Sequence, residues 1–191
     1  MSSTISHLDK INQLIASFDL EALQAFHSVS MTKQFKKGSF LLRAGEVCQY
    51  SFLLQSGIAR KFIYEQEKEI TTEIYVEQDL AVSFYGYVFQ KPSRESIECL
   101  TDVTVQMTSY RGFQDAKKRF PAWMELDLLI TELYTAWLEE RLLEFQTLNA
   151  TQRYEKMRQQ TPHLIQQVQL THLASYLGIS LETLSRIRSK R

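Results

Sequence analysis

The stretch 169–190 has the residue types and spacing of a surface that contacts a polyanion. A short helix is expected first, and Gly178 ends it in the left-handed conformation that glycine adopts without a steric penalty. Ser180 is placed to cap a second helix, because its hydroxyl can accept from a backbone N–H two or three residues further on. Helical spacing then turns Leu184 and Ile187 inwards and leaves a row of mostly polar side chains facing outwards.

Two of these outward side chains can distinguish base pairs in a major groove. Glu182 can accept a hydrogen bond from the amino group of cytosine, and Arg186 can form a bidentate pair with guanine. Neighbouring polar and basic side chains are placed to hold phosphates. The predicted contact set is Gln169, Ser180, Leu181, Glu182, Thr183, Ser185, Arg186, Arg188 and Lys190. The pattern predicts a helix-turn-helix on double-stranded DNA, although the same shape also occurs in helical bundles that touch no DNA.

The distribution of charge favours the C-terminal end as the site of polyanion binding. The whole chain is formally neutral, with 22 Lys and Arg against 22 Asp and Glu. Residues 151–191 hold 7 of the basic and 2 of the acidic side chains, which leaves 15 and 20 for residues 1–150. An acidic part joined to a basic part is typical of a protein whose basic end meets nucleic acid, but an ordinary solvated tail has the same composition.

Composition argues against several other classes of protein. The 191 residues are 44% hydrophobic, which suffices for one good core or for a medium and a small domain. The sequence contains neither a secretory signal nor eighteen consecutive apolar residues, so we expect a cytoplasmic protein without a membrane partner. Cys48 and Cys99 lack CxxC spacing and the four histidines are scattered. We therefore expect no metal and no cofactor.

Residues 31–110 have the texture of an antiparallel β structure. Short β-branched and aromatic runs alternate with turns that contain glycine or proline. The predicted strands are 32–35, 40–42, 50–54, 58–64, 70–76, 96–100 and 104–109. Strands of this length and spacing predict a sandwich or a roll. Two short helices are expected before it, because apolar side chains recur at helical spacing in the first thirty residues.

A long helix is predicted from Pro121 to about Leu148, since proline suits the first turn and nothing after it would break the helix. At 1.5 Å per residue it would be about 40 Å long, too long for so small a roll to cover. One stripe at three–four spacing contains Leu126, Ile130, Leu133 and Trp137 and begins at Trp123; it continues with a one-residue offset through Leu138, Leu142, Phe145 and Leu148. We interpret this stripe as the seam of a homodimer; the alternative is a helix packed only on its own domain.

Three segments resemble the catabolite activator protein/fumarate-nitrate regulator superfamily, and the resemblance covers essentially the whole chain. Residues 35–46 (Phe-Lys-Lys-Gly-Ser-Phe-Leu-Leu-Arg-Ala-Gly-Glu) resemble its second and third strands, residues 52–57 its next hairpin and residues 178–186 its DNA-reading motif. The resemblance implies a cyclic-nucleotide-binding-type β-roll, a dimerisation helix and a winged helix-turn-helix. It also implies that Glu182 and Arg186 contact bases, whereas Leu181 replaces the family's first base-reading Arg.

The ligand pocket of that family is matched poorly. The family holds cyclic AMP with a Gly-Glu pair and an Arg-Ser pair, but residues 81–87 (Ala-Val-Ser-Phe-Tyr-Gly-Tyr) offer neither Gly nor Glu at the expected step. Ser93 and Arg94 stand in the reverse order. Cyclic AMP is therefore not the expected effector, and the aromatic side chains either line an apolar pocket or fill it. The candidate effector pocket comprises Val82, Ser83, Phe84, Tyr85, Ser93 and Arg94.

The sequence thus predicts an α+β protein that is not an enzyme. Residues 1–119 form an N-terminal antiparallel jelly-roll domain of the cyclic-nucleotide-binding type, residues 120–148 the dimerisation helix, and residues 149–191 a helix-turn-helix domain with a truncated or absent wing. The predicted function is a homodimeric, sequence-specific DNA-binding transcription regulator. Its candidate partners are double-stranded DNA, a second copy, RNA polymerase and an unknown small-molecule effector.

A protein of another class is the alternative. In that case the roll is a cupin-like module that binds a small molecule, and the C-terminal helices serve assembly instead of DNA binding. Cupin enzymes usually need clustered histidine and carboxylate ligands on facing strands, and the predicted strands contain no histidine.

Overall fold

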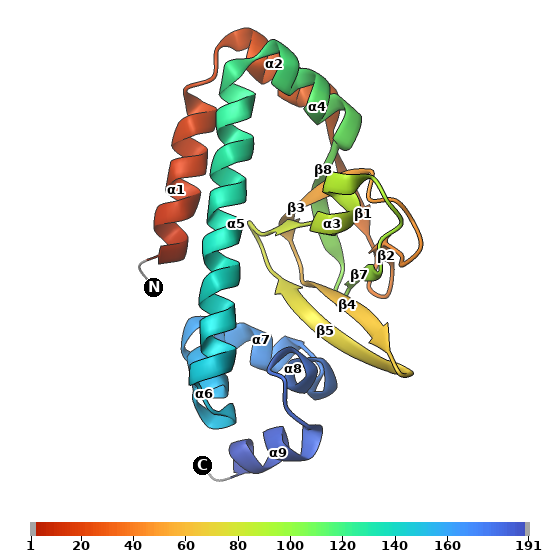
Figure 1. Cartoon of the computed structure of the whole chain (residues 1–191), viewed down its shortest axis with the longest axis vertical. Helices are drawn as coiled ribbons and strands as arrows, with labels where there is room; N and C mark the ends of the chain where they lie inside the picture. The colour runs from red at the N-terminus through yellow and green to blue at the C-terminus, as the bar shows by residue number, and fades with distance from the viewer. Residues whose placement is uncertain (1–2, 190–191) are drawn as a thin grey trace.

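The computed structural model describes residues 3–189, and the side chains of residues 10–189. A β-roll lies beside one long helix, and a group of short helices packs below both (Figure 1). The strands are β1 (Ser30–Phe35), β2 (Phe40–Leu42), β3 (Tyr50–Ser56), β4 (Ala59–Glu65), β5 (Lys68–Tyr75), β6 (Leu80–Ala81), β7 (Glu95–Cys99) and β8 (Val103–Ser109). The helices are α1 (Ser3–Ala16), α2 (Leu20–Val29), α3 (Phe84–Phe89), α4 (Tyr110–Arg119), α5 (Pro121–Thr147), α6 (Ala150–Gln160), α7 (Pro162–Gln167), α8 (Leu170–Tyr176) and α9 (Leu181–Ser189).

Within residues 3–189 the strands form two four-stranded antiparallel sheets. One sheet has the order β1-β8-β3-β6 and the other β2-β7-β4-β5, so β5 is an edge strand. The first core lies between the sheets and draws apolar side chains from both of them. Cys48 and Cys99 are free thiols buried in this core. The roll is therefore closed by side chains that alternate inwards from two sheets, as the strand pattern predicted.

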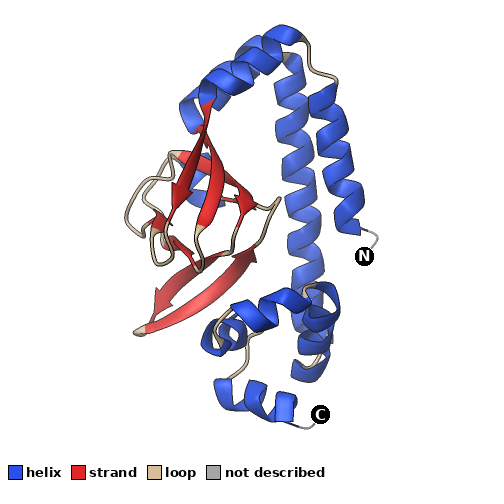
Figure 2. Cartoon of the chain, turned by 180° about the vertical axis from the view of Figure 1, so that it is seen from behind, coloured by secondary structure: helices blue, strands red, loops and turns tan. Residues whose placement is uncertain are grey.

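A second core joins the first turns of α5 to the helices that flank the roll. Trp123 is fully buried there, and its ring lies 6.0 Å from that of Phe18, 5.6 Å from Phe26 and 5.4 Å from Phe113. Leu126 is buried in the same cluster. Helix α1 runs alongside α5, as the view from behind also shows (Figure 2). These contacts fix the start of the long helix relative to the roll.

A third core holds the C-terminal helices together and attaches them to the roll. Leu173 and Leu184 are buried between α8 and α9, and Tyr154 packs on them from α6. Ile58 belongs to the same cluster although it lies in the roll, at the start of β4. The C-terminal helices and the edge of the roll thus share one apolar interior.

The α+β architecture predicted from the sequence is confirmed, including all seven expected strands and the long helix. Sequence analysis missed α3, α4 and the two-residue strand β6, and it left the stretch that forms α6 and α7 unassigned. Up to Ser189, where the described residues end, no strand follows α9. No helix among residues 3–189 combines the length and apolarity needed to cross a lipid bilayer.

Asp79 gives the fold a stability that depends on pH. Its carboxylate accepts a hydrogen bond from Val76 N at 2.8 Å in the turn after β5, but burial raises its pKa to about 6. The pKa of Asp79 is therefore higher in the folded protein than in the unfolded chain. The neutral, protonated carboxyl contributes stability to the fold below about pH 4, and this contribution is lost as pH rises through 6, because a charged carboxylate is then buried. We expect Asp79→Asn to raise the melting temperature at pH 7.5 and to have little effect at pH 3.5.

The matched control is Glu77→Gln, which removes the same charge from an exposed position on the same turn. Its melting temperature should follow that of the unmodified protein at both pH values. A destabilised Asp79→Asn at pH 7.5 would contradict the assignment of burial as the dominant effect.

Candidate nucleic-acid interface

A tight turn joins α8 to α9. Gly178 has φ of +66°, and its N–H donates to Ser175 O at 3.0 Å while Ile179 N donates to Ala174 O at 3.0 Å. This pair of hydrogen bonds is the Schellman arrangement that closes a helix through a left-handed residue. Ser180 Oγ then accepts from Thr183 N at 3.2 Å, which caps α9. The predicted turn and cap are therefore present in the structure.

Helix α9 has an apolar inner face and an exposed outer face. Leu184 is fully buried and Ile187 packs on the third core. The side chains on the other side, including Leu181 at 38% exposure, face solvent. The exposed members of the predicted contact set are Gln169, Ser180, Leu181, Glu182, Ser185, Arg186 and Arg188, and Thr183 is half-buried. Lys190 lies outside the described residues.

The two side chains expected to contact bases are one helical turn apart on the exposed face. The Glu182 carboxylate has a pKa below its usual value, because its own backbone N–H and the Ser180 hydroxyl stabilise the charge. Arg186 makes only long contacts of 3.4 Å, from Nε to Glu182 O and from an Nη to Thr183 Oγ1. Glu182 is therefore an ionised acceptor, and the guanidinium of Arg186 is free to reorient towards a ligand.

The N-terminus of α8 and the exposed face of α9 enclose a shallow hollow. It has a volume of about 360 Å³ and is lined by Leu170, Ser185, Arg188 and Ser189. Gln169 precedes α8 and its side chain makes no capping hydrogen bond. A DNA phosphate beside a recognition helix is held by hydrogen-bond donors, and the Gln169 amide and the Arg188 guanidinium are donors of this kind.

Two arginines attach the end of α8 to α5 and to α6. Arg141 on α5 donates to Tyr176 O at 2.9 Å, and Arg153 on α6 donates to Leu177 O at 3.0 Å. The last carbonyl groups of a helix have no partner within the helix and carry a partial negative charge. The guanidinium of Arg141 also lies over the ring of Tyr176, 3.9 Å from its centre. The turn of the motif is thus bound to α5 and to α6 by one charge-assisted hydrogen bond each, and neither was predicted from the sequence.

Phe145 on α5 fills the space next to Gly178. A Cβ atom built at Gly178 would lie only 2.7 Å from Phe145 Cε1. The absence of a side chain at Gly178 therefore serves two purposes, the left-handed backbone and the close approach of an aromatic ring. The recognition helix is positioned by the long helix through this contact.

The other face of α8 docks on the edge strand β5. Ser175 Oγ accepts from Thr71 N at 2.8 Å and lies 3.3 Å from Glu69 O, to which it donates. The same Glu69 pairs through its side chain with the buried Arg60, at 2.5 Å. One hydroxyl group thus satisfies two backbone groups of a strand edge that would otherwise lack partners. The motif is held against the roll while the face of α9 stays exposed.

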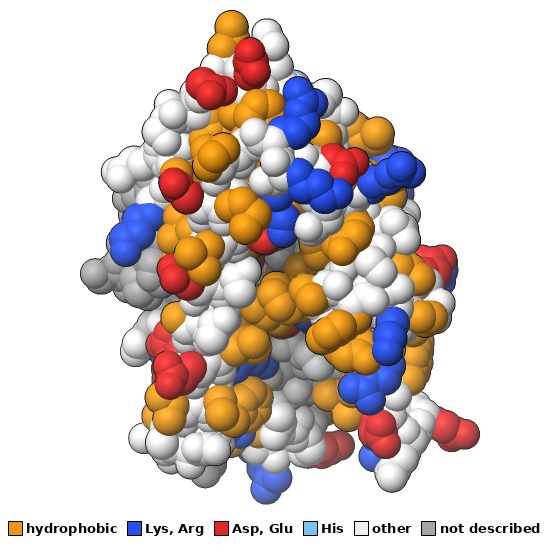
Figure 3. All heavy atoms as spheres, turned by 45° about the horizontal axis from the view of Figure 1, so that its top comes forward, with side chains coloured by type: hydrophobic (Ala, Val, Ile, Leu, Met, Phe, Trp, Pro, Cys, Tyr) orange, Lys and Arg blue, Asp and Glu red, His pale blue; other side chains and the backbone are white. Residues whose placement is uncertain are grey.

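The outward face of α5 differs from the stripe selected in the sequence. Leu126 is buried within its own chain, Ile130 and Leu133 are half-buried, and Trp137 is 36% exposed with its ring stacked 5.7 Å from that of Tyr134. The large apolar side chains that face solvent along α5 are Met124, Leu128, Trp137, Leu138, Leu142, Leu143 and Phe145. Hydrophobic side chains gather in patches on the face that Figure 3 displays. The first part of the predicted stripe therefore packs within its own chain, whereas Leu138, Leu142 and Phe145 of its continuation are exposed.

The predicted effector pocket is largely filled by protein. Val82, Ser83 and Ser93 are buried, Phe84 is half-buried, and Tyr85 and Arg94 point towards solvent. Ser83 and Ser93 bond to each other and to Glu95. The polar groups of this region therefore satisfy one another.

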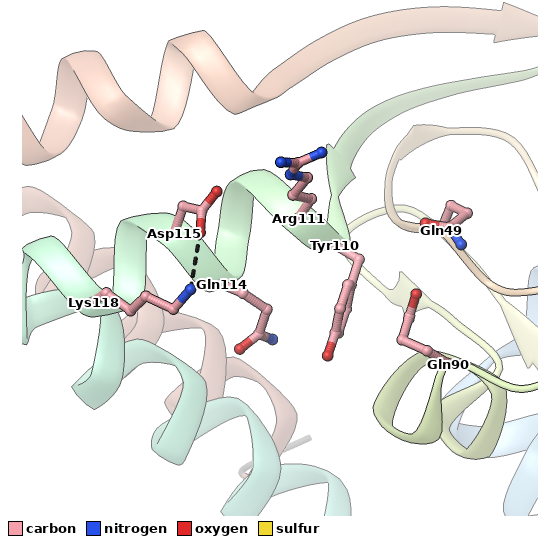
Figure 4. A pocket seen from close by; sticks show the side chains of 7 residues that line it. All are labelled: Gln49, Gln90, Tyr110, Arg111, Gln114, Asp115 and Lys118. Carbon is pink, nitrogen blue, oxygen red and sulfur yellow. Dashed lines mark hydrogen bonds and ion pairs between the residues drawn. The ribbon is translucent and has the colours of Figure 1, made fainter.

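A larger hollow of about 630 Å³ lies elsewhere, between α4 and the end of the roll (Figure 4). Its lining is polar and comprises Gln49, Gln90, Tyr110, Arg111, Gln114, Asp115 and Lys118. Lys118 pairs with Asp115 at 3.1 Å across one turn of α4. The hollow shares no residue with the predicted effector pocket.

The Phe145–Gly178 contact generates a prediction about stability. Gly178→Ala should lower the free energy of unfolding by the left-handed conformational penalty of about 1–2 kcal/mol plus the cost of displacing Phe145. Gly45→Ala is the matched control, because Gly45 has φ of +90° with no atom within 4 Å of the added Cβ. Urea titration of both variants measures the difference.

The part of the Gly178→Ala cost that comes from displacing Phe145 should disappear when the Phe145 ring is removed. In the background Phe145→Ala, Gly178→Ala should cost no more than Gly45→Ala, which a double-mutant cycle tests directly. Equal costs of Gly178→Ala in the two backgrounds would show that Phe145 does not constrain the turn.

The comparisons with known proteins agree with the fold. Residues 32–120 match the sequence family of the cyclic nucleotide-binding domain. No curated protein matches the chain. Among solved structures, the catabolite activator protein of Thermus thermophilus is 18% identical with a TM-score of 0.57, covering 93% of this chain and 85% of that one.

Two further solved structures have the same architecture. FixK2 of Bradyrhizobium japonicum is 16% identical, with a TM-score of 0.68 and coverage of 85% and 84%. The c-di-GMP-responsive regulator CLP of Xanthomonas campestris is 16% identical, with a TM-score of 0.62 and coverage of 90% and 91%. At these identities the likeness establishes the fold. Residues 32–120 are therefore similar to a cyclic nucleotide-binding domain, and the chain shares the fold of these solved structures.

Proposed function

We propose that this protein is a sequence-specific DNA-binding transcription regulator that acts as a homodimer. The observation that carries the proposal is the exposed face of α9, where Glu182, Ser185 and Arg186 project from a helix whose other face packs on the third core. A helix of this kind, placed second in a helix-turn-helix, enters a major groove with its N-terminal residues against the base edges. The docking of α8 on the roll uses Ser175 and leaves this face free.

The exposed stripe of α5 supports the dimer. Met124, Leu128, Leu138, Leu142 and Phe145 lie on a four–three repeat, the repeat of a two-helix seam, whose two intervening positions, 131 and 135, are threonines. A second copy packed on this stripe would cover apolar area that the chain itself leaves in solvent. In such a dimer two recognition helices about 34 Å apart would contact successive major grooves of a nearly palindromic site.

The alternative, a cupin-like roll that binds a small molecule, has less support. Its expected site is the interior of the roll, where Ser83 and Ser93 are already engaged with Glu95. Solved relatives by fold include the sensor domain of the transcriptional regulator DNR from Pseudomonas aeruginosa, at 18% identity.

Selection from a pool of random duplex DNA tests the function. The purified protein should enrich a two-fold-symmetric sequence, and its affinity should fall as salt rises because counterions are released from phosphates. Retention of DNA with no enriched sequence would contradict specific recognition. The binding would then be explained by the basic charge of the C-terminal part alone.

Arg186 and Arg188 should differ in what they contribute. Arg186→Ala should relax discrimination at one base position by roughly 1–3 kcal/mol. Arg188→Ala should weaken binding to all sequences about equally and reduce the salt dependence. Competition binding against a panel of single-base operator variants separates the two effects. If Arg186→Ala retains the full discrimination of the unmodified protein, this arginine does not contact a base.

Leu142 lies on the exposed stripe of α5, and a charge there should split the dimer. We expect Leu142→Asp to sediment as a monomer with an unchanged circular dichroism spectrum, because an aspartate would be buried unpaired at the seam. Met31→Asp is the control, since Met31 is equally exposed (both 58%) but lies on β1. Dimeric Leu142→Asp at micromolar concentration would remove this stripe from the interface.

A further inference from the structure

The interior of the roll contains a buried lysine. Lys61 lies on β4 with its side chain only 3% exposed, and its Nζ is 2.5 Å from Glu73 Oε1 on β5 and 3.6 Å from Glu95 Oε1 on β7. Val82 O lies 3.4 Å from the same nitrogen. An ammonium group taken out of water is stable only when it is paired in this way. Burial alone would lower the pKa of Lys61. The charges of Glu73 and Glu95 raise it by more than burial lowers it, so the pKa is above its usual value.

The lysine belongs to a network that includes the predicted effector pocket. Glu95 Oε2 accepts from Ser83 Oγ at 2.5 Å, and Ser93 Oγ donates to Ser83 Oγ at 2.8 Å. Glu95 N in turn donates to Ser93 Oγ at 2.9 Å. The hydroxyl groups that a bound phosphate would need are thus engaged with protein. One ammonium and two carboxylates lie here together, and this balance of charge repels an anionic ligand.

The same network reaches the long helix. Tyr134 OH on α5 donates to Glu73 Oε1 at 3.2 Å. The Tyr134 ring also stacks on that of Phe84, the first residue of α3, at 4.9 Å and 24°. Since Phe84 follows Ser83 directly, α5 contacts the network at two points. A change at Lys61 would be passed to α5 through Glu73 and Tyr134.

We propose that Lys61 is a built-in ligand of the roll, whose ammonium group occupies the polar interior, excludes anionic effectors such as cyclic nucleotides and holds α5 in its DNA-binding position. The regulatory part of this proposal rests on the proposed function. A roll from which the lysine side chain is removed would accept a primary alkylammonium ion, because Glu73 and Glu95 would then lack their cation.

Chemical rescue of Lys61→Ala tests the proposal. This variant lacks three methylene groups and the ammonium, which n-propylammonium chloride replaces. We expect a lower melting temperature and about a tenfold loss of DNA affinity. Millimolar n-propylammonium should restore both, whereas equal concentrations of sodium chloride or n-propanol should restore neither. The unmodified protein should show no thermal shift with n-propylammonium or with cyclic AMP.

Lys117→Ala is the matched control for the rescue. Lys117 pairs with Asp127 at 2.5 Å and is mostly buried, but it lies outside the roll. Because the Asp127 side chain is 39% exposed, water solvates its charge when the lysine is removed, so this variant should not respond to n-propylammonium. A Lys61→Ala protein that binds DNA like the unmodified protein, or that n-propylammonium does not stabilise, would overturn the proposal. A thermal shift of the unmodified protein with cyclic AMP would also overturn it.

Tyr134→Phe provides a second test that does not disturb the lysine. It keeps the stacking on Phe84 and removes only the hydroxyl that reaches Glu73, so DNA affinity should fall several-fold while the roll keeps its amide-exchange protection. Tyr64→Phe is the control, because Tyr64 OH bonds Glu69 at 2.9 Å on the outside of the roll. Unchanged affinity in Tyr134→Phe would disprove the link to α5. Thermal rescue by the amine needs no DNA, so it tests the closed site even if the protein binds no operator.

Discussion

The attachment of α5 to neighbouring elements at both of its ends is the constraint on which the rest of the structure depends. At its start, Trp123 and Leu126 are enclosed by α1, α2 and α4. Near its end, Phe145 lies against the bare backbone of Gly178, and Arg141 holds the carbonyl of Tyr176. Because α5 is attached at two distant points, a rotation of the helix at one end also moves the elements that contact its other end. The direction of the recognition helix is therefore set relative to the roll by one rigid element.

The middle of the same helix is tied to the roll by polar contacts. Tyr134 reaches the buried charge network of the roll, whereas nearer the C-terminal end of α5 the ionic partner is Lys156 on α6, which pairs with Glu140 at 2.8 Å and with Glu144. Buried apolar side chains fix the position of α5, whereas its hydrogen bonds and ion pairs depend on the exact placement of a few atoms. The ends of α5 thus supply rigidity, and its middle is the place where a small change in the roll has the largest effect.

The sequence predicted the elements better than it predicted the contacts between them. The turn at Gly178, the cap at Ser180 and the inward face of Leu184 followed from local rules of helix geometry. The exposed stripe of α5 followed only in its second half, because two stripes compete in the first half and only the packing of α1, α2 and α4 decides that Leu126 is internal. Ser175, Arg141 and Arg153 were missed because their partners are backbone groups distant in the sequence.

One signal for the charge network was present in the sequence. Arg60 and Lys61 are adjacent in a strand whose alternation must turn one of them inwards, and Glu73 occupies the middle of the next predicted strand. Charged residues at such positions need partners. Which partners they find depends on the register of β4 against β5 and β7, which includes a bulge between Lys61 and Phe62 that periodicity does not reveal.

The docking of α8 on β5 also bears on how separable the two parts of the chain are. Strand β5 is an edge strand whose free side is covered by Ser175, and Ile58, Ile74 and Val76 contribute to the core beneath the C-terminal helices. Removing those helices would expose a strand edge together with an apolar surface, the combination that leads to aggregation. The C-terminal helices thus also act as a protective cover, and the roll is not a module that can be cut free or exchanged without replacing that cover.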